Sequence, residues 1–454
     1  MLKFYPSFTN IMNTYSSIAG NQTGIIKATA LPLVDIDDGV NLRSITGTMP
    51  DYHKRIFKNT EVSIAYHVVG YGEFYEESLI RYTGESVERY SGMMSSHIYK
   101  NYIRHASYKE LTDEGNKVMP LKYIDVFSQE QMNKYSKLIG DIPSISISED
   151  DILGWVQCPS LFNKDQKIWV PAKMIFTGYE TSIEKNEKSY IQSFSTGTAS
   201  HKTFKQALLN AMVEYAQIDA FMLTWFCKLK CPEIEFDIPV VKEITGRIGG
   251  GEEKNFYTKS LYMSLPDMDL PVIGTFIIRN DDKVPYMLFG IQGDYDLKNA
   301  AVRSVMEGAA ISYSSFFNTI FDVDSVRYAM GKDPTFLDLD GNVMYYGLPD
   351  QNENKLATVE DLCKGKIKLS EIKTIDNLDL DSQLKSMMKY LEKKSEYGVY
   401  LDITPPELRE KGWHTARVFI PELLEMCLPD LPFKNHPRMK EFGGVINDNP
   451  HPMP

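Results

Sequence analysis

The chain has 454 residues, of which 43% are hydrophobic and 24% are charged, a mixture typical of a packed globular protein. Acidic side chains outnumber basic ones by 61 to 49, which argues against nucleic-acid binding because a phosphate backbone would be repelled. No secretory signal pattern or long apolar run is visible, and the five cysteines are scattered. We therefore expect a cytoplasmic protein without a disulfide framework.

Strands and helices are predicted to be mixed without strict alternation. In chain order, short apolar or alternating runs predict strands at 24–34, 63–70, 167–178, 272–280 and 286–293. The segment RNDDK between the last two runs predicts a hairpin turn. Helical spacing predicts three long helices, at 74–92, 203–229 and 298–320. The pattern predicts an α+β or mixed α/β fold rather than a repeated Rossmann unit.

Composition divides the chain into three parts. Residues 1–60 form an N-terminal segment, and residues 61–430 form the main domain, with a polar insertion near 335–390. Residues 431–454 are rich in Pro, Asn and Gly and predict an extended arm. Within the main domain, the loop GRIGGGE has the glycine spacing of a phosphate-binding loop, but Glu252 stands where lysine would be needed. This loop therefore predicts a hairpin or a lid.

The first helix carries two glutamates that share a face. Glu85 and Glu88 are three residues apart, which places them about one helical turn from each other, and Arg89 follows directly. One interpretation is a solvated acidic stripe on the surface. The alternative is that neighbouring aromatic and aliphatic residues draw these carboxylates toward the interior.

The other two long helices also carry glutamates in apolar surroundings. Thr203 and Gln206 have capping-box spacing before the second helix, which holds Glu214. In the third helix, Arg303 precedes Glu307 by four residues, so a simple ion pair is one interpretation. Glutamates on three helices suggest a site for a divalent metal with oxygen ligands. Magnesium shares its coordination sphere with phosphates, which points toward a nucleotide.

The chain ends with proline at every second position, at Pro450, Pro452 and Pro454. Proline has no amide hydrogen and a fixed φ, so this tail must run extended. It is either a frayed end or a stiff device that delivers the terminal carboxylate to a defined place.

Together these segments resemble the YcaO family, and more narrowly the azoline-forming cyclodehydratases of thiazole/oxazole-modified microcin pathways of the streptolysin S type. The likeness runs from about residue 60 to the C-terminus. Its most specific parts are ESVERY at 85–90, STGTASHKTFKQALLNAMVE at 195–214 and the terminal Pro-x-Pro-x-Pro. The resemblance implies that Glu85 and Glu88 bind Mg²⁺, that Arg89 contacts the nucleotide, and that the tail prolines reach the active site.

On the second helix the resemblance implies that Gln206, Glu214 and Gln217 bind the cofactor, with Glu214 also a metal ligand; Glu307 is the candidate from the third helix. Family members usually carry a second Glu-x-x-Glu-Arg where this chain has Glu214, Gln217 and Ile218, and a glutamate in place of Gln206. Glutamine brings no charge, and isoleucine cannot contact phosphate.

The activity implied by the resemblance is an ATP-dependent cyclodehydration within a ribosomal precursor peptide, in the maturation of bacteriocins or cytolysins. A Cys, Ser or Thr side chain attacks the preceding carbonyl, ATP phosphorylates the amide oxygen, and a thiazoline or oxazoline ring remains. The implied partners are an E1-like protein that binds the leader and an FMN-dependent azoline dehydrogenase, in a heteromeric complex that can contain a homodimer.

Two alternatives come from other classes. A degenerate YcaO domain could dock the peptide and partner enzymes without using ATP, which the Gln206, Gln217 and Ile218 departures favour. A YcaO enzyme of different chemistry, such as backbone thioamidation, is disfavoured by the proline tail. If the tail is a stiff catalytic arm, extending or shortening it is expected to stop cyclisation without changing the melting temperature.

Overall fold

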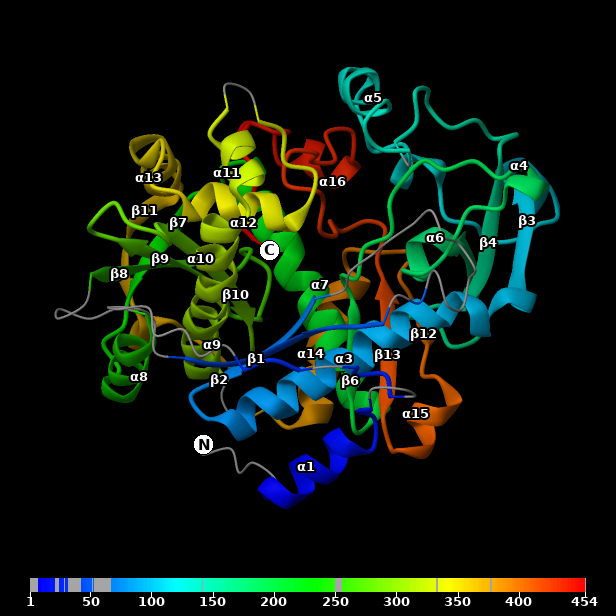
Figure 1. Cartoon of the computed structure of the whole chain (residues 1–454). Helices are drawn as coiled ribbons and strands as arrows, with labels where there is room; N and C mark the ends of the chain where they lie inside the picture. The colour runs from blue at the N-terminus through cyan, green and yellow to red at the C-terminus, as the bar shows by residue number, and fades with distance from the viewer. Residues whose placement is uncertain are drawn as a thin grey trace.

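The computed structural model describes residues 7–20, 24–27, 29–31, 42–50, 52, 67–140, 142–249, 255–331, 334–375 and 378–453. Its largest sheet has five strands in the order β10-β9-β8-β7-β11. These strands are β7 (Cys231–Glu235), β8 (Phe256–Tyr262), β9 (Val272–Arg279), β10 (Met287–Gly293) and β11 (Cys363–Lys368). Neighbouring strands are antiparallel except β11, which runs parallel to β7. Figure 1 shows this sheet on the left of the molecule.

Three smaller antiparallel sheets complete the described strands. The first pairs β1 (Arg43–Thr48) with β2 (His67–Gly72). The second has the order β3-β4-β5, with strands at Ile103–Ser107, Ile152–Pro159 and Lys167–Pro171. The third has the order β12-β13-β6, with strands at Val399–Asp402, His414–Phe419 and Thr198–His201.

Helices cover the sheets and fill the space between them (Figure 1). The two longest are α3 (Tyr75–Ile98) and α7 (Phe204–Phe226). The others are α1 (Phe8–Ser16), α4 (Tyr108–Asp113), α5 (Gln129–Tyr135), α6 (Ala172–Ile175), α8 (Pro239–Gly249), α9 (Leu297–Ala310), α10 (Ser312–Phe321), α11 (Val323–Ala329), α12 (Leu339–Gly347), α13 (Asn352–Leu362), α14 (Leu380–Glu392), α15 (Pro406–Glu410) and α16 (Pro437–Glu441). In the described part of the chain, no helix has the length and apolar character needed to span a bilayer.

Helix α7 is the central element because its sequence is apolar around most of its circumference, which is typical of a helix packed on several sides. Thr203 caps its N-terminus by accepting the backbone N–H of Gln206 at 3.3 Å. At the other end, Phe221 stacks on Phe289 of β10 with ring centroids 4.9 Å apart. The helix therefore joins the β12-β13-β6 sheet to the five-stranded sheet, and any side chain on it has a well-defined position.

The predicted mixed fold is confirmed, and the three predicted helices are present with one change. The third divides at Ile311 into α9 and α10. The hairpin between β9 and β10 is also confirmed. The strand predicted at 167–178 ends at Pro171, where α6 begins, and the described part of 24–34 forms only isolated bridges.

Two segments expected at the periphery are integrated into the domain. The segment 335–390 supplies the edge strand β11 and the helix α12. The predicted arm 431–454 contains α16 and contributes Leu431, Phe433 and Met439 to the main core. The boundary near residue 60, the loop residue Glu252 and Pro454 lie outside the described residues, so these predictions stay predictions.

Candidate functional site

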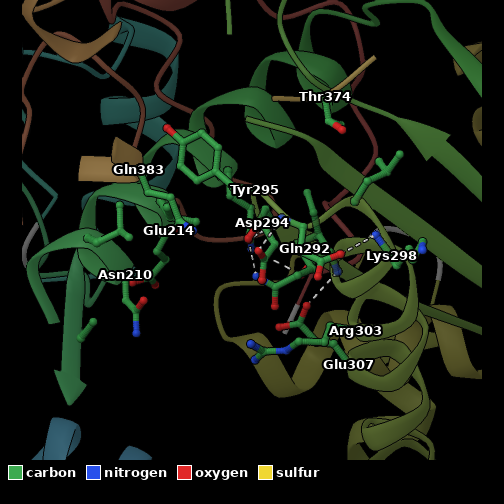
Figure 2. Close-up of a pocket in the computed structure, with 18 of the residues that line it drawn as sticks. Asn210, Glu214, Gln292, Asp294, Tyr295, Lys298, Arg303, Glu307, Thr374 and Gln383 are labelled. Atoms are coloured by element: carbon green, nitrogen blue, oxygen red, sulfur yellow. Dashed lines mark hydrogen bonds between the residues drawn. The ribbon is translucent and has the colours of Figure 1, made fainter. Parts of the chain in front are cut away.

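A cavity of about 1600 Å³ lies between α3, α7, α9 and β10, and it collects most of the residues predicted from sequence. The predicted residues among its lining are Glu85, Glu88, Gln206, Glu214, Gln217 and Glu307. Figure 2 shows Glu214 facing the cavity from α7, with Arg303 and Glu307 on α9 across from it. The interpretation of Glu85 and Glu88 as a solvated surface stripe is therefore wrong.

Backbone amides hold the four glutamates in place. The bonds are from Val69 N to Glu85 Oε2 at 3.0 Å, from Gly197 N to Glu214 Oε2 at 3.2 Å and from Ile291 N to Glu307 Oε2 at 2.8 Å. Glu88 is hydrogen-bonded by the backbone of Ser200. For each of the first three carboxylates, this backbone bond uses the Oε2 oxygen, and no backbone group of the described residues donates to the Oε1 oxygen. This arrangement is suited to ligand binding.

The pKa of each of the four carboxylates is raised above its ordinary value. Burial raises the pKa of Glu85 and Glu88 above their ordinary values, and it raises the pKa of Glu214 and of Glu307 to about 7. Repulsion between neighbours adds to this, from Glu214 and Glu85 on Glu88, from Glu307 on Glu214 and from Glu85 on Glu307. A ring of four like charges in a partly enclosed cavity is stabilised by a bound cation.

Arg89 stands beside this ring. Its Nη1 donates to Ser195 Oγ at 2.9 Å, and its Nη2 lies 3.5 Å from Glu85 Oε1. The guanidinium lowers the pKa of Glu85, Glu88 and Glu214 against the larger effect of burial. Arg89 therefore offsets part of the negative charge of the site.

Arg303 is a site residue that sequence reasoning missed. The spacing predicts an ion pair with Glu307, but no ion pair among the described residues joins the two, although the charge of Arg303 lowers the pKa of Glu307. Instead it lines the cavity next to Tyr71, and its Nε is buried without a hydrogen-bond partner among the described residues. In the sequence, the signal for this role is an arginine one helical turn before Glu307. Lys298 and Lys373 also line the cavity, so among its described lining residues three cationic side chains share it with seven acidic ones.

The two glutamines differ in what their amides do. Gln217 accepts from Gly293 N at 2.6 Å and donates to Ile291 O at 3.4 Å, so its amide completes the edge of β10. Gln206 donates to Asn210 Oδ1 at 2.9 Å, and its amide does not close the capping box that its spacing suggested. Ile218 is buried in the core. Cofactor binding by the two glutamines stays a prediction.

The C-terminal tail is buried and reaches the cavity. Pro450, His451 and Pro452 are buried, and Met453 lines the cavity. The interpretation of the tail as a frayed end is therefore wrong for residues 450–452. His451 packs edge-on against Phe221 and Phe226, its Nε2 lies 2.9 Å from Cys427 O, and burial lowers its pKa to about 4. This neutral, enclosed ring is an anchor rather than a base.

A protein-family model described as "YcaO cyclodehydratase, ATP-ad Mg2+-binding" matches residues 69–424. The chain belongs to the YcaO family. The family description agrees with the predicted enzyme class, a YcaO cyclodehydratase, and with the predicted cofactors, ATP and Mg²⁺. The streptolysin S subtype stays a prediction. No curated protein sequence matches the chain significantly.

Solved structures share the YcaO fold at low sequence identity. A structure described as "Heterocyclase in complex with substrate and Cofactor" has a TM-score of 0.71 at 16% identity and covers 100% of this chain, which spans 59% of that protein. YcaO from Methanopyrus kandleri bound with AMPPCP and Mg²⁺ has a TM-score of 0.59 at 12% identity, covering 91% of this chain and 90% of that one. A chain of the E. coli microcin synthetase McbBCD complex with pro-MccB17 bound has a TM-score of 0.58 at 16% sequence identity. The match covers 94% of this chain and 96% of that one.

The residues of the cavity fit a magnesium nucleotide. Within the described ranges, no three His, Cys, Asp or Glu side chains converge into a complete metal site. Carboxylates therefore meet at most in pairs. Mg²⁺ typically takes one or two carboxylates and completes its octahedron with water and phosphate oxygens. Arg303, whose Nε is buried without a partner among the described residues, suits an anionic phosphate chain.

Replacing Glu307 by Gln is expected to stabilise the YcaO protein at pH 8 without ligand. The amide can still accept the Ile291 N–H, while one like charge is removed from the ring. Because the pKa of Glu307 is raised to about 7, the wild type loses stability as pH rises from its unfolded value of about 4.5 through 7, and the variant loses less. Melting temperatures at pH 6 and pH 8 measure this difference.

With Mg²⁺ and AMPPCP present, the wild type should gain more thermal stability than Glu307→Gln. Glu392→Gln, an exposed change on α14, is the matched control and should behave as wild type in every condition. A Glu307→Gln protein that is less stable than wild type at pH 8 would contradict the electrostatic account of the cavity.

Proposed function

We propose that this YcaO protein converts Cys, Ser or Thr residues of a ribosomally made precursor peptide into thiazolines or oxazolines, using ATP to activate the backbone amide oxygen. The observation that carries this proposal is the meeting of four glutamates, several cations and the C-terminal tail in one cavity. The cavity is large enough for a nucleotide and a peptide segment together.

The roles of the chain's own residues follow from their positions. Glu85, Glu88, Glu214 and Glu307 would hold Mg²⁺ ions, each ion by one or two of these carboxylates. Arg303, which lines the cavity, and Arg89, which lies beside Glu85, would contact phosphate oxygens. Bound Mg-ATP supplies the phosphoryl group that turns the amide oxygen into a leaving group. Because backbone amides already fix the carboxylates, this electrostatic environment is in place before the charge develops, which is the most effective form of stabilisation.

Proton removal is assigned to the tail. His451 is enclosed, neutral and hydrogen-bonded away from the cavity, so it does not serve as the base. Met453 lines the cavity, so the tail reaches the site. We therefore assign the role of base to a carboxylate carried by the tail, with Pro450, Pro452 and Pro454 as its rigid carrier, as the family resemblance implies.

Partners and context are part of the proposal. The chain is proposed to work in the cytoplasm with an E1-like leader-binding protein and an FMN-dependent azoline dehydrogenase, as a homodimer within a heteromeric complex, in a streptolysin S-like or bacteriocin pathway. Support comes from the fold that this chain shares with a chain of the E. coli microcin synthetase McbBCD complex. That complex was solved with pro-MccB17 bound.

A second candidate is a scaffold that docks peptide and partners without using ATP. The observation that favours it is that the Gln217 amide is committed to β10 and that Ile218 lies in the core. Two groups that would serve a nucleotide in other family members are thus replaced. The intact ring of four carboxylates favours the enzyme, and the buried proline tail disfavours a thioamidating YcaO protein.

Glu85→Gln and Glu88→Gln are each expected to abolish ring formation while leaving the fold intact, because each removes one charged Mg²⁺ ligand. Mass spectrometry of the precursor peptide, incubated with enzyme, partner proteins and Mg-ATP, counts the water lost for each ring. Glu76→Gln, at the start of the same helix α3, is the control. If both variants form rings at a near-normal rate, the metal assignment is wrong.

Glu214→Ala separates the two candidate functions. As part of the ring of carboxylates, Glu214 should affect nucleotide binding, so its loss is expected to weaken Mg-AMPPCP binding about tenfold or more while peptide affinity changes little. Calorimetry with each ligand measures both constants. A change in peptide affinity alone would favour the scaffold.

A further inference from the structure

The buried tail has its backbone carbonyls satisfied by side chains from two helices. Trp225 Nε1 of α7 donates to Asn449 O at 3.1 Å, and Tyr346 Oη of α12 donates to Pro450 O at 2.6 Å. Asn342 Nδ2 of α12 donates to both His451 O and Met453 O at 2.7 Å. The tail passes through the core without belonging to any sheet.

This environment explains why proline suits alternate positions. A buried N–H without a partner is costly, and proline has no N–H to satisfy. Of the residues between the prolines, His451 donates its N–H to Pro429 O at 3.3 Å. The chain therefore needs donors for its carbonyls more than acceptors for its amides, and the two α12 side chains provide them.

Asn342 and Tyr346 lie four residues apart, on one face of α12. Tyr346 binds the earlier part of the tail and Asn342 the later part, so the tail runs from the C-terminal toward the N-terminal end of the helix and leaves it at the cavity. Asn342 is completely buried, and its Oδ1 has no partner among the described residues. An unsatisfied buried oxygen destabilises the fold, so the presence of Asn342 is better explained by its two donated hydrogen bonds than by a gain in stability.

The helix that carries these donors is itself held firmly. Lys355 of α13 is buried, and its Nζ donates to Tyr345 O at 2.6 Å and to Leu348 O at 2.7 Å. A lysine that caps terminal carbonyls stabilises the end of a helix. Tyr346 thus lies on a rigid support rather than on a mobile loop.

We propose that Asn342 and Tyr346 form a clasp that sets the register of the C-terminal tail and so positions its end in the active site. Both are positioning residues, because they touch the tail rather than the substrate. This inference rests on the proposed function, in which the tail acts in catalysis. It assigns the positioning of the tail to α12, a helix within the polar segment 335–390 that the sequence suggested was peripheral.

The first experiment measures the tail directly. Met453→Cys, made in a chain that also carries Cys363→Ser, places one accessible thiol at the cavity, since the other four cysteines are buried. Adding Tyr346→Phe should speed reaction with a thiol reagent about fivefold, as expected for one lost hydrogen bond. Asn342→Ala should have a larger effect. Tyr345→Phe removes a neighbouring hydroxyl that makes no hydrogen bond to the described tail residues 449–453, and it should leave the rate unchanged.

The second experiment measures ring formation in the otherwise wild-type chain with its partner proteins. Tyr346→Phe should lower kcat about tenfold to a hundredfold through misplacement of the tail, while KM for the peptide and for ATP stays within twofold. A merely structural role would lower the amount of folded enzyme and leave the kcat of the folded fraction unchanged.

Thiol reactivity and kcat test the clasp and its role in catalysis independently. Unchanged thiol reactivity in both Tyr346→Phe and Asn342→Ala would overturn the clasp. Faster reactivity with unchanged kcat would show that the clasp exists and does not position a catalytic group, which overturns the proposal. Faster reactivity in a protein whose wild type forms no rings would instead overturn the proposed function and leave the clasp as a structural fact.

Discussion

The constraint on which the site depends is the cost of keeping four carboxylates around one cavity. They come from three helices: two from α3, one from α7 and one from α9. Burial raises the pKa of each, and repulsion by neighbouring carboxylates raises the pKa of Glu88, Glu214 and Glu307 further. Such an arrangement is unfavourable by itself and becomes favourable with a cation, which is typical of functional sites.

The rest of the fold supports this arrangement. The apolar surface of α7 fixes Glu214 between two sheets, and the Gln217 amide on the same helix completes the edge of β10. That strand in turn supplies the Ile291 N–H to Glu307. The site is therefore built on rigid elements with a supporting layer of hydrogen bonds, which active sites require when geometry must be held closely. The C-terminus lies beside α7 and α12 (Figure 1), and Met453 of the tail lines the same cavity.

The sequence predicted the parts of the site that depend on local spacing. Glu85 and Glu88 share a helix face whatever the tertiary structure, and the alternating prolines could only be extended. Arg303 could not be predicted as a cavity residue, because a spacing of four residues from Glu307 is equally typical of an ion pair. Only the tertiary structure shows that the two do not form one. The contacts of Asn342 and Tyr346 with the tail could not be predicted for a similar reason, since they join residues more than 100 positions apart. The polar segment around these two residues also resembles a surface insertion. The break at Ile311 and the commitment of Gln217 to β10 are also tertiary effects.

The most direct test of the account is the stoichiometry of ATP use. Purified YcaO protein, its partner proteins and the precursor peptide would be incubated with Mg-ATP, with phosphate release and loss of water from the peptide followed in the same samples. The account predicts one phosphate released for each ring formed, and no release above background without peptide. Rings formed without matching phosphate, or peptide bound with neither rings nor phosphate, would contradict it.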